Sequence, residues 1–274
     1  MDAGRIRNFG IVAHIDAGKT TLSERLLYLT GVITRLGEVH EGTATLDWME
    51  EERKRGITIS AAVATLAWRE HELHLVDTPG HVDFTLEVER AMRVLDGAVL
   101  LVSAVDGVQA QTETVWRQVR RHAVPAIAFV NQMDRVGADH QHCLDDLAKR
   151  LRTRPVPLQI PIGAEKEHVG VVDLLERSAL YFEEGPRGRA FRRGPVPAHL
   201  HDEVEVLRSE LVDLLAEHDE AILSAAIEDA DVTASALRAA LRPRVQSGEL
   251  LPVLCGSALR TIGVQPLLDA IVDL

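Results

Sequence analysis

A short segment near the amino terminus contains the residue types that bind phosphate. Residues 13–21 read Ala-His-Ile-Asp-Ala-Gly-Lys-Thr-Thr. Gly18 lets the backbone approach a phosphate closely, and the Lys19 ammonium adds a positive charge that reaches the outer phosphates. The Thr20 hydroxyl is a suitable ligand for Mg²⁺, because this hard cation prefers oxygen. The spacing therefore predicts a P-loop that holds a nucleoside triphosphate and Mg²⁺.

The segments on either side of this loop have the pattern that a P-loop requires. An apolar run at 9–12 predicts a buried strand, and apolar residues at helical spacing predict a helix over 22–29. Backbone N–H groups and the positive end of that helix would surround the anion. The loop opens with Ala13 where the general pattern has Gly. A chance Gly-Lys-Thr is the alternative, and the strand–loop–helix context disfavours it.

A second candidate phosphate site follows the predicted strand 73–76. Asp77 can hold a Mg²⁺-bound water, and the Gly80 N–H can face a γ-phosphate. His81 would then lie beside that phosphate, where an imidazole can orient the attacking water. Thr58, upstream, would bring a second hydroxyl to Mg²⁺. A plain Pro-Gly turn and a structural histidine are the alternatives, and the P-loop makes both less favoured.

Two further segments have the residues to recognise a base. Asn131-Gln132-Met133-Asp134 follows the predicted strand 126–130. An aspartate carboxylate can accept two N–H bonds from guanine, which adenine cannot supply in that geometry, so Asp134 disfavours an ATP-dependent enzyme. Losing such charge-assisted bonds costs about 1.5–3 kcal/mol, roughly 10–150-fold in affinity. Gly256-Ser257-Ala258, after a predicted strand, can offer a backbone N–H to the guanine oxygen.

Strands and helices alternate along the chain. Continuous apolar runs at 98–102 and 126–130 predict buried strands, and helical spacing predicts helices over 111–122 and 139–152. The alternation predicts an α/β fold of the P-loop NTPase type, with a doubly wound, mostly parallel sheet flanked by helices. Ligands of such sheets bind at the carboxyl ends of the strands, which is where the motifs lie.

The pattern changes near Pro155. We expect residues 160–249 to be an α+β insertion between the last two elements of the sheet, so that 1–159 and 250–274 form one domain. Within the insertion we expect one loop and two amphipathic helices, over 185–197, 203–217 and 233–246.

Composition narrows the possible partners and the compartment. The 274 residues carry a formal net charge of −12, which argues against DNA or RNA binding driven by bulk charge. Cys143 and Cys255 are far apart and indicate a reduced protein rather than a disulfide or metal site. We recognise no signal peptide and no apolar run long enough to cross a membrane, so we expect a cytoplasmic protein.

Four motifs together resemble the GTPase domain of translational GTPases; they are Ala-His-Ile-Asp-Ala-Gly-Lys-Thr-Thr, Arg-Gly-Ile-Thr-Ile, Asp-Thr-Pro-Gly-His and Gly-Ser-Ala. The segments 41–49 and 263–269 resemble elongation factor G more narrowly. The insertion resembles the G′ subdomain of that family. The likeness covers essentially the whole chain, and Ala13 is usual in this family.

The resemblance implies a role for each site residue. The phosphates of GTP or GDP would be bound by Asp16, Ala17, Gly18, Lys19, Thr20 and Thr21. The base would be bound by Asn131, Gln132, Asp134, Ser257 and Ala258. Mg²⁺ would be held by Thr20, Thr58 and Asp77. Catalysis would depend on His81, which the large-subunit RNA of the ribosome positions, together with Asp16 and Gly80.

The resemblance also implies hydrolysis of GTP to GDP and phosphate, stimulated by the ribosome and coupled to translocation or ribosome recycling. We expect a monomer. A ribosomal protection GTPase for tetracycline resistance shares this domain and is one alternative. A truncated nucleotide-binding module with little hydrolysis is another, since the chain stops at Leu274, where the GTPase domain of this family ends.

One departure lies in the base motif. The family has Asn-Lys-x-Asp, whereas this chain has Gln132. The lysine stem covers the base and its ammonium reaches the P-loop, while glutamine is shorter and uncharged. We therefore expect GTP to be preferred over ATP, because Asp134 is retained, but to bind more weakly than in a lysine-bearing relative.

Overall fold

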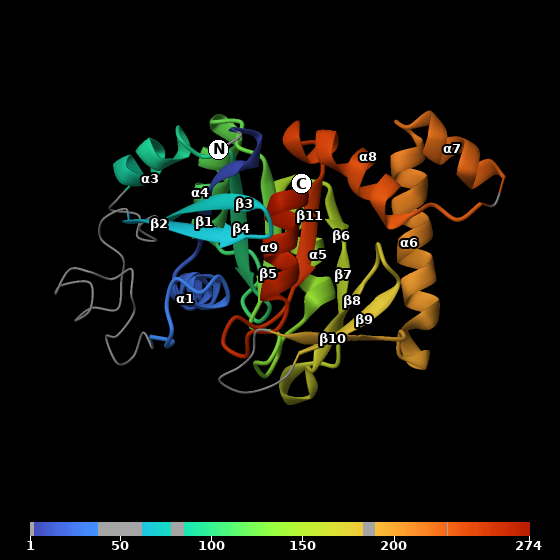
Figure 1. Cartoon of the computed structure of the whole chain (residues 1–274), viewed down its shortest axis with the longest axis horizontal. Coiled ribbons are helices and arrows are strands. Elements are labelled where there is room, and N and C mark those ends of the chain that lie inside the picture. Colours follow the sequence, from blue (N-terminus) through green and yellow to red (C-terminus); the bar gives the residue numbers. More distant parts are fainter. Residues whose placement is uncertain (1–2, 38–61, 78–84, 183–189, 229) are drawn as a thin grey trace.

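A seven-stranded sheet forms the centre of the molecule (Figure 1). The computed structural model describes residues 3–37, 62–77, 85–182, 190–228 and 230–274. Along the sheet the strand order is β2-β3-β1-β4-β5-β11-β6. The β2–β3 pair is antiparallel and the other neighbours run parallel. The strands are β1 Ile6–Ala13, β2 Ala62–Trp68, β3 His71–Asp77, β4 Gly97–Ser103, β5 Ala126–Asn131, β6 Pro155–Pro157 and β11 Leu251–Cys255.

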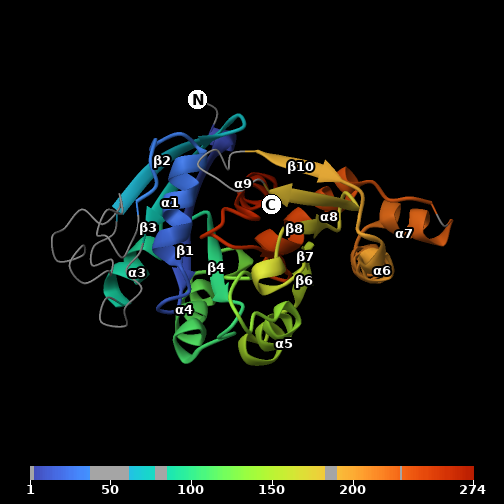
Figure 2. The ribbon, with the colours of Figure 1, turned by 90° about the horizontal axis from the view of Figure 1, so that it is seen from below.

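Helices cover both faces of this sheet. One face packs against α1 (Lys19–Leu29) and α9 (Val264–Asp273). The other packs against α3 (Thr85–Met92), α4 (Ala110–Arg121) and α5 (His140–Leu151), and Figure 2 shows α4 and α5 on the side opposite α9. Successive residues of a strand point to opposite faces, so Ile11 enters the first core and Val12 the second. The predicted doubly wound α/β fold is confirmed.

A second, antiparallel sheet lies beyond the β6 edge of the first (Figure 1). Its strands follow the order β10-β9-β8-β7 and are β7 Gln159–Ile162, β8 Gly170–Asp173, β9 Ser178–Phe182 and β10 Phe191–Gly194. Three helices lie between β10 and β11 in the chain: α6 His201–Ala216, α7 Glu220–Ile227 and α8 Ala234–Gln246. Short 3-10 helices occur at Ala3–Arg5, Glu165–Glu167 and Ala198–Leu200. None of the described helices is long and apolar enough to cross a membrane.

Most predicted elements are present, and one expectation is wrong. The segment 185–197, expected to be a loop, contains β10, which pairs with β9 from Phe191 opposite Phe182 to Gly194 opposite Ala179. β10 is an edge strand with two exposed arginines, so it lacks the apolar run that marks the predicted strands. The sequence pattern also missed β9 and α7. Both cysteines are buried and free.

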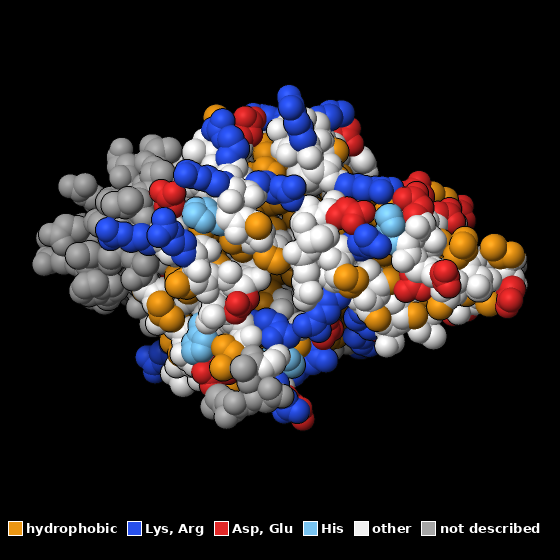
Figure 3. Space-filling model, turned by 90° about the horizontal axis from the view of Figure 1, so that it is seen from above, with side chains coloured by type: hydrophobic (Ala, Val, Ile, Leu, Met, Phe, Trp, Pro, Cys, Tyr) orange, Lys and Arg blue, Asp and Glu red, His pale blue; other side chains and the backbone are white. Residues whose placement is uncertain are grey.

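Acidic side chains gather at the end of the molecule formed by α6 and α7 (Figure 3). Residues 201–228 contain nine Asp or Glu residues and a single Arg. That arginine, Arg208, is buried and does not offset the charge at the surface. Among the described residues, negative charge is therefore concentrated at this end of the molecule.

Candidate functional site

The loop after β1 has a backbone shaped to surround an anion. It runs from His14 to Gly18 and leads directly into α1. Asp16 and Gly18 both adopt left-handed conformations, with φ of 65° and 95°. Helix α1 begins at Lys19 without a side-chain cap and without an acidic residue in its first turn. Its first backbone N–H groups and its positive end are therefore suited to binding a phosphate.

Position 18 requires glycine for a second reason. A Cβ atom on Gly18 would lie 2.5 Å from Nδ2 of Asn131, at the end of β5. A side chain at this position would therefore push the P-loop away from the predicted base motif. The positive φ adds strain for any other residue type.

Lys19 and Asp77 form a buried ion pair at the carboxyl ends of β1 and β3. The Lys19 Nζ donates to Asp77 Oδ1 at 2.7 Å, and the two side chains are 10% and 0% exposed. Parallel pairing sets Ile11 of β1 opposite Asp77 of β3. The register of the sheet thus brings together two predicted motifs that are 58 residues apart.

The oxygen donors near this ion pair have the chemistry of a Mg²⁺ site. Thr20 lies in the first turn of α1, next to Lys19, and Asp77 ends β3. Hydroxyl and carboxylate oxygens suit Mg²⁺, which usually completes its coordination with water and substrate phosphates. No cluster of three or more His, Cys, Asp or Glu residues suited to a metal occurs in the part of the chain that the structure describes. The residues present fit a cation held jointly with a nucleotide.

Asn131 connects three loops that are far apart in the sequence. Its Nδ2 donates to the carbonyl of Ala17 in the P-loop at 2.8 Å. Its Oδ1 accepts a bond from the backbone N–H of Ala258 at 2.8 Å. The side chain is 2% exposed, so both bonds are shielded from water. The structure therefore joins the P-loop, the 131–134 motif and the 256–258 motif through one amide group.

Gln132 also contacts the P-loop. Its Nε2 donates to the carbonyl of Asp16 at 2.9 Å, and its Oε1 accepts from the Arg135 guanidinium at 3.4 Å. A left-handed backbone conformation, with φ of 67°, turns the side chain of Gln132 toward this loop. Glutamine therefore spans the distance to the P-loop despite being shorter than lysine. What it lacks is the positive charge and the longer apolar stem.

Asp134 and Ser257 lie in tight turns beside Asn131. The backbone N–H of Arg135 donates to the carbonyl of Gln132 at 3.0 Å, which closes the turn that carries the half-buried Asp134. The buried hydroxyl of Ser257 accepts from the N–H of Arg260 at 3.1 Å. Ser257 therefore stabilises the turn of its own loop. In the same loop, the backbone N–H of Ala258 donates to the side chain of Asn131.

Two residues that the sequence pattern did not reveal support the P-loop from α4. Gln111 Oε1 accepts a bond from the N–H of Ile15 at 2.9 Å. Thr112 Oγ1 lies 3.2 Å from Nδ1 of His14. Burial lowers the pKa of His14, and nearby Asp106 and Asp16 raise it in opposition. Neither α4 residue belongs to a recognisable motif, so only the folded arrangement reveals this support.

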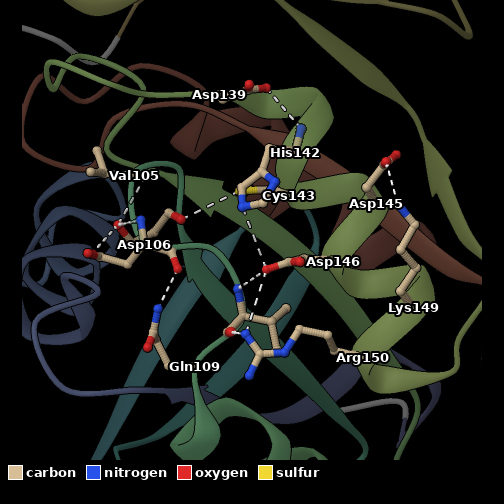
Figure 4. A network of polar contacts seen from close by, with 12 residues as sticks. Val105, Asp106, Gln109, Asp139, His142, Cys143, Asp145, Asp146, Lys149 and Arg150 are labelled. Atoms are coloured by element: carbon tan, nitrogen blue, oxygen red, sulfur yellow. Dashed lines mark hydrogen bonds and ion pairs between the residues drawn. The ribbon is translucent and has the colours of Figure 1, made fainter.

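A network of polar contacts holds the loop between β4 and α4 in place (Figure 4). Asp106 accepts a bond from the Ser103 hydroxyl at 2.7 Å. Asp146 of α5 accepts a bond from the N–H of Val108 at 3.0 Å, and Arg150 donates to the Val108 carbonyl. This network fixes the start of α4 and therefore the two residues that contact the P-loop.

Some predicted site residues lie outside the described part of the chain. These are Thr58, Gly80 and His81. Within the described residues, contacts join the P-loop, the end of β3, the 131–134 motif and the 256–258 motif into one site.

Comparisons with known proteins agree with this arrangement. The family model described as "Elongation factor Tu GTP binding domain" matches residues 4–274. Elongation factor G 1 of Geobacter sulfurreducens is 53% identical over 269 residues, which are 98% of this chain and 39% of that protein. Elongation factor G of Anaplasma phagocytophilum is 51% identical over 272 residues, which are 99% of this chain and 39% of that protein.

A solved structure is similar over the same region. A crystal structure of a protein from Thermus thermophilus has a TM-score of 0.89 and 36% identity, and the match covers 99% of this chain and 40% of that one. The chain thus spans 39% of the length of the two curated relatives. The chain belongs to the family of elongation factor Tu GTP binding domains.

Proposed function

We propose that this chain binds and hydrolyses GTP as part of an elongation-factor-G-like translation factor, which the ribosome stimulates during translocation or ribosome recycling. The observation that carries the proposal is the amide of Asn131, which joins the P-loop to both candidate base loops. Relatives named elongation factor G, which are 53% and 51% identical over nearly the whole chain, support a role in translation. The protein acts as a monomer in the cytoplasm.

The phosphates and Mg²⁺ bind at the carboxyl ends of β1 and β3. The backbone of Asp16 to Thr21 surrounds the phosphates, and Lys19 moves its charge from Asp77 to them when the nucleotide enters. Thr20, Asp77 and Thr58 would hold Mg²⁺, which would supply positive charge to offset the charge of the phosphates. The Lys19–Asp77 ion pair supports this, because it holds an ammonium and a carboxylate side by side at the phosphate-binding loop.

The guanine base binds between the two loops that Asn131 holds. Asp134 accepts bonds from the two guanine N–H groups that adenine does not supply in this geometry, and the Ser257–Ala258 loop approaches the guanine oxygen. Gln132 covers part of the base while its amide bonds the P-loop. The half-buried position of Asp134 supports this role.

His81 orients the attacking water, assisted by Gly80 and Asp16, once ribosomal RNA of the large subunit positions the imidazole. Residues 160–249 form an inserted G′-like subdomain, and 1–159 with 250–274 form the GTP-binding domain. The separate antiparallel sheet between β6 and β11 in chain order supports this division.

Release of phosphate from GTP, measured with and without ribosomes, tests the proposal. The unmodified chain should hydrolyse GTP faster with ribosomes, and His81→Ala should lose that stimulation while still binding nucleotide. His199→Ala, at an exposed histidine of a 3-10 helix, is the matched control and should behave like the unmodified chain. Equal turnover by His81→Ala would contradict the assigned role. Nucleotide binding without phosphate release would instead indicate a binding module.

A further inference from the structure

A loop of the second sheet packs against the turn that carries Asp134. The loop spans residues 163–169 between β7 and β8 and is named here the 163–169 loop. The backbone N–H of Glu165 donates to the carbonyl of Met133 at 2.9 Å. The Glu165 carboxylate accepts a bond from the N–H of Gly137 at 2.9 Å. Glu165 thus holds the 132–138 turn from both sides of Asp134.

The same loop also contacts the 256–262 turn. The guanidinium of Arg260 donates to the carbonyl of His168 at 2.8 Å and lies 3.5 Å from the carbonyl of Lys166. The backbone N–H of Arg260 bonds the Ser257 hydroxyl, so the residue connects its own turn to the second sheet. Both candidate base loops are therefore attached to one segment outside the first sheet.

Local backbone geometry, steric contacts and a hydrogen bond constrain the conformation of the 163–169 loop. Gly163 and Glu165 adopt left-handed conformations, with φ of 75° and 55°. A Cβ on Gly163 would overlap the carbonyl of Glu167, so the loop closes tightly on itself. His168 is fully buried, and the N–H of Val169 donates to the carbonyl of Ile162 at 3.0 Å. A rigid segment can transmit a fixed geometry to the turns that it contacts.

We propose that Glu165 is a positioning residue for guanine specificity, because its carboxylate fixes the turn from which Asp134 recognises the base. Two N–H groups of guanine must reach the two oxygens of Asp134 at the same time. A loosely held turn therefore weakens this bidentate contact more than it weakens a single hydrogen bond to Asp134. Arg260 acts in the same way on the loop that holds Ser257 and Ala258. The inference rests on the proposed binding of guanine nucleotide, and it assigns part of the base selectivity to the second sheet.

Comparing the affinities of guanosine diphosphate and inosine diphosphate tests this role. Inosine lacks the 2-amino group, so it offers Asp134 only one of the two N–H groups. Glu165→Ala should weaken binding of guanosine diphosphate by about tenfold, the size of one lost charge-assisted contact, and weaken inosine diphosphate less. Glu165→Gln keeps an oxygen acceptor, so it should retain most of the ratio of the affinities for guanosine diphosphate and inosine diphosphate. Arg260→Ala should shrink the same ratio.

The matched control is Glu176→Ala. Glu176 also lies in the second unit, which comprises the antiparallel sheet and helices α6, α7 and α8, and it pairs with Arg238 at 2.6 Å, away from both base loops. This variant should leave the ratio unchanged. Titration calorimetry on each variant, with circular dichroism to confirm folding, gives the affinities. An unchanged ratio in Glu165→Ala, or an equal loss for both ligands, would overturn the positioning role. If the unmodified chain binds GDP no better than ADP, the proposed function itself fails.

Discussion

At the scale of single residues, the candidate site depends on side chains that join loops as much as on those that face a ligand. Asn131 bonds both Ala17 and Ala258 from a buried position. The sequence motif predicted a base-binding asparagine, and the structure adds that its amide bonds both loops. Gln111 and Thr112 support the P-loop in a comparable way, and no motif signals them. Such contacts depend on which helix packs beside a loop, so residue types alone do not reveal them.

Replacing Gln132 by lysine should tighten GTP binding. Glutamine already donates to the Asp16 carbonyl, so the gain comes from the added positive charge and the longer stem over the base. A gain of about two- to fivefold is expected, in the range of one partly exposed charge interaction. Titration calorimetry measures it directly. Unchanged affinity in Gln132→Lys would show that the glutamine amide suffices.

The buried histidines His140 and His168 should make stability fall in acid. Burial lowers the pKa of each to about 4; Asp139 opposes this at His140, and Arg260 adds to it at His168. The unfolded chain binds these protons near pH 6.5, whereas the folded chain does not until about pH 4. Unfolding is therefore favoured progressively as the pH drops from 6.5 to 4, by up to about 3 kcal/mol for each histidine.

Urea unfolding at pH 7.5 and at pH 5 checks this dependence. His168→Leu, which removes one of the two groups, should show a smaller loss of stability between these pH values. His199→Leu, at an exposed position, should keep the loss seen in the unmodified chain. Parallel behaviour of the two variants would contradict the account.

At the scale of elements, the centre of the large sheet was predictable because β4, β5 and β11 are buried on both faces. Runs such as Ala98–Val102 are continuously apolar, and this pattern is typical of strands in a parallel sheet that helices cover on both faces. β10 was not predictable in this way, because its stability comes from pairing with β9 and from Arg192 stacking 4.9 Å from the Tyr181 ring centroid. These contacts are long-range and leave little trace in a local window of sequence.

The second unit depends on one buried arginine. Arg208 of α6 is 5% exposed and donates to the carbonyls of Leu174, Leu175 and Val232. Arg208→Ala would leave these acceptors unpaired and open a cavity, so we expect it to lower the free energy of unfolding by about 2–4 kcal/mol. Urea unfolding followed by circular dichroism measures this loss.

Arg177→Ala is the comparison for that variant. Arg177 pairs with Asp231 at 2.6 Å but is exposed, and surface ion pairs contribute less than about 1 kcal/mol. Similar losses for the two variants would show that the buried carbonyl contacts do not stabilise the second unit.

At the scale of the whole molecule, the parallel sheet gathers distant motifs at one edge. This convergence was predictable, because the carboxyl ends of adjacent parallel strands must meet, and the Lys19–Asp77 pair follows from it. The attachment of the second sheet to the base loops was not predictable, since it joins Glu165 to Met133 and Gly137 through turns with no shared pattern.

Under the proposed function, the distribution of charge limits which end of the molecule can approach ribosomal RNA. The acidic end formed by α6 and α7 would be repelled by a phosphate backbone (Figure 3). Under the proposed function, we expect this end to face away from RNA while the edge with the candidate site faces the large subunit.

We propose above that Asp134 selects guanine at a site built from three joined loops. Binding of GDP, xanthosine diphosphate and ADP to the unmodified chain and to Asp134→Asn tests it most directly by calorimetry. Xanthine carries an oxygen in place of the guanine 2-amino group, so an asparagine amide can donate to it where a carboxylate cannot. If Asp134 selects guanine, the unmodified chain prefers GDP and Asp134→Asn prefers xanthosine diphosphate, each by at least about tenfold. Unchanged preference for GDP in Asp134→Asn would contradict it.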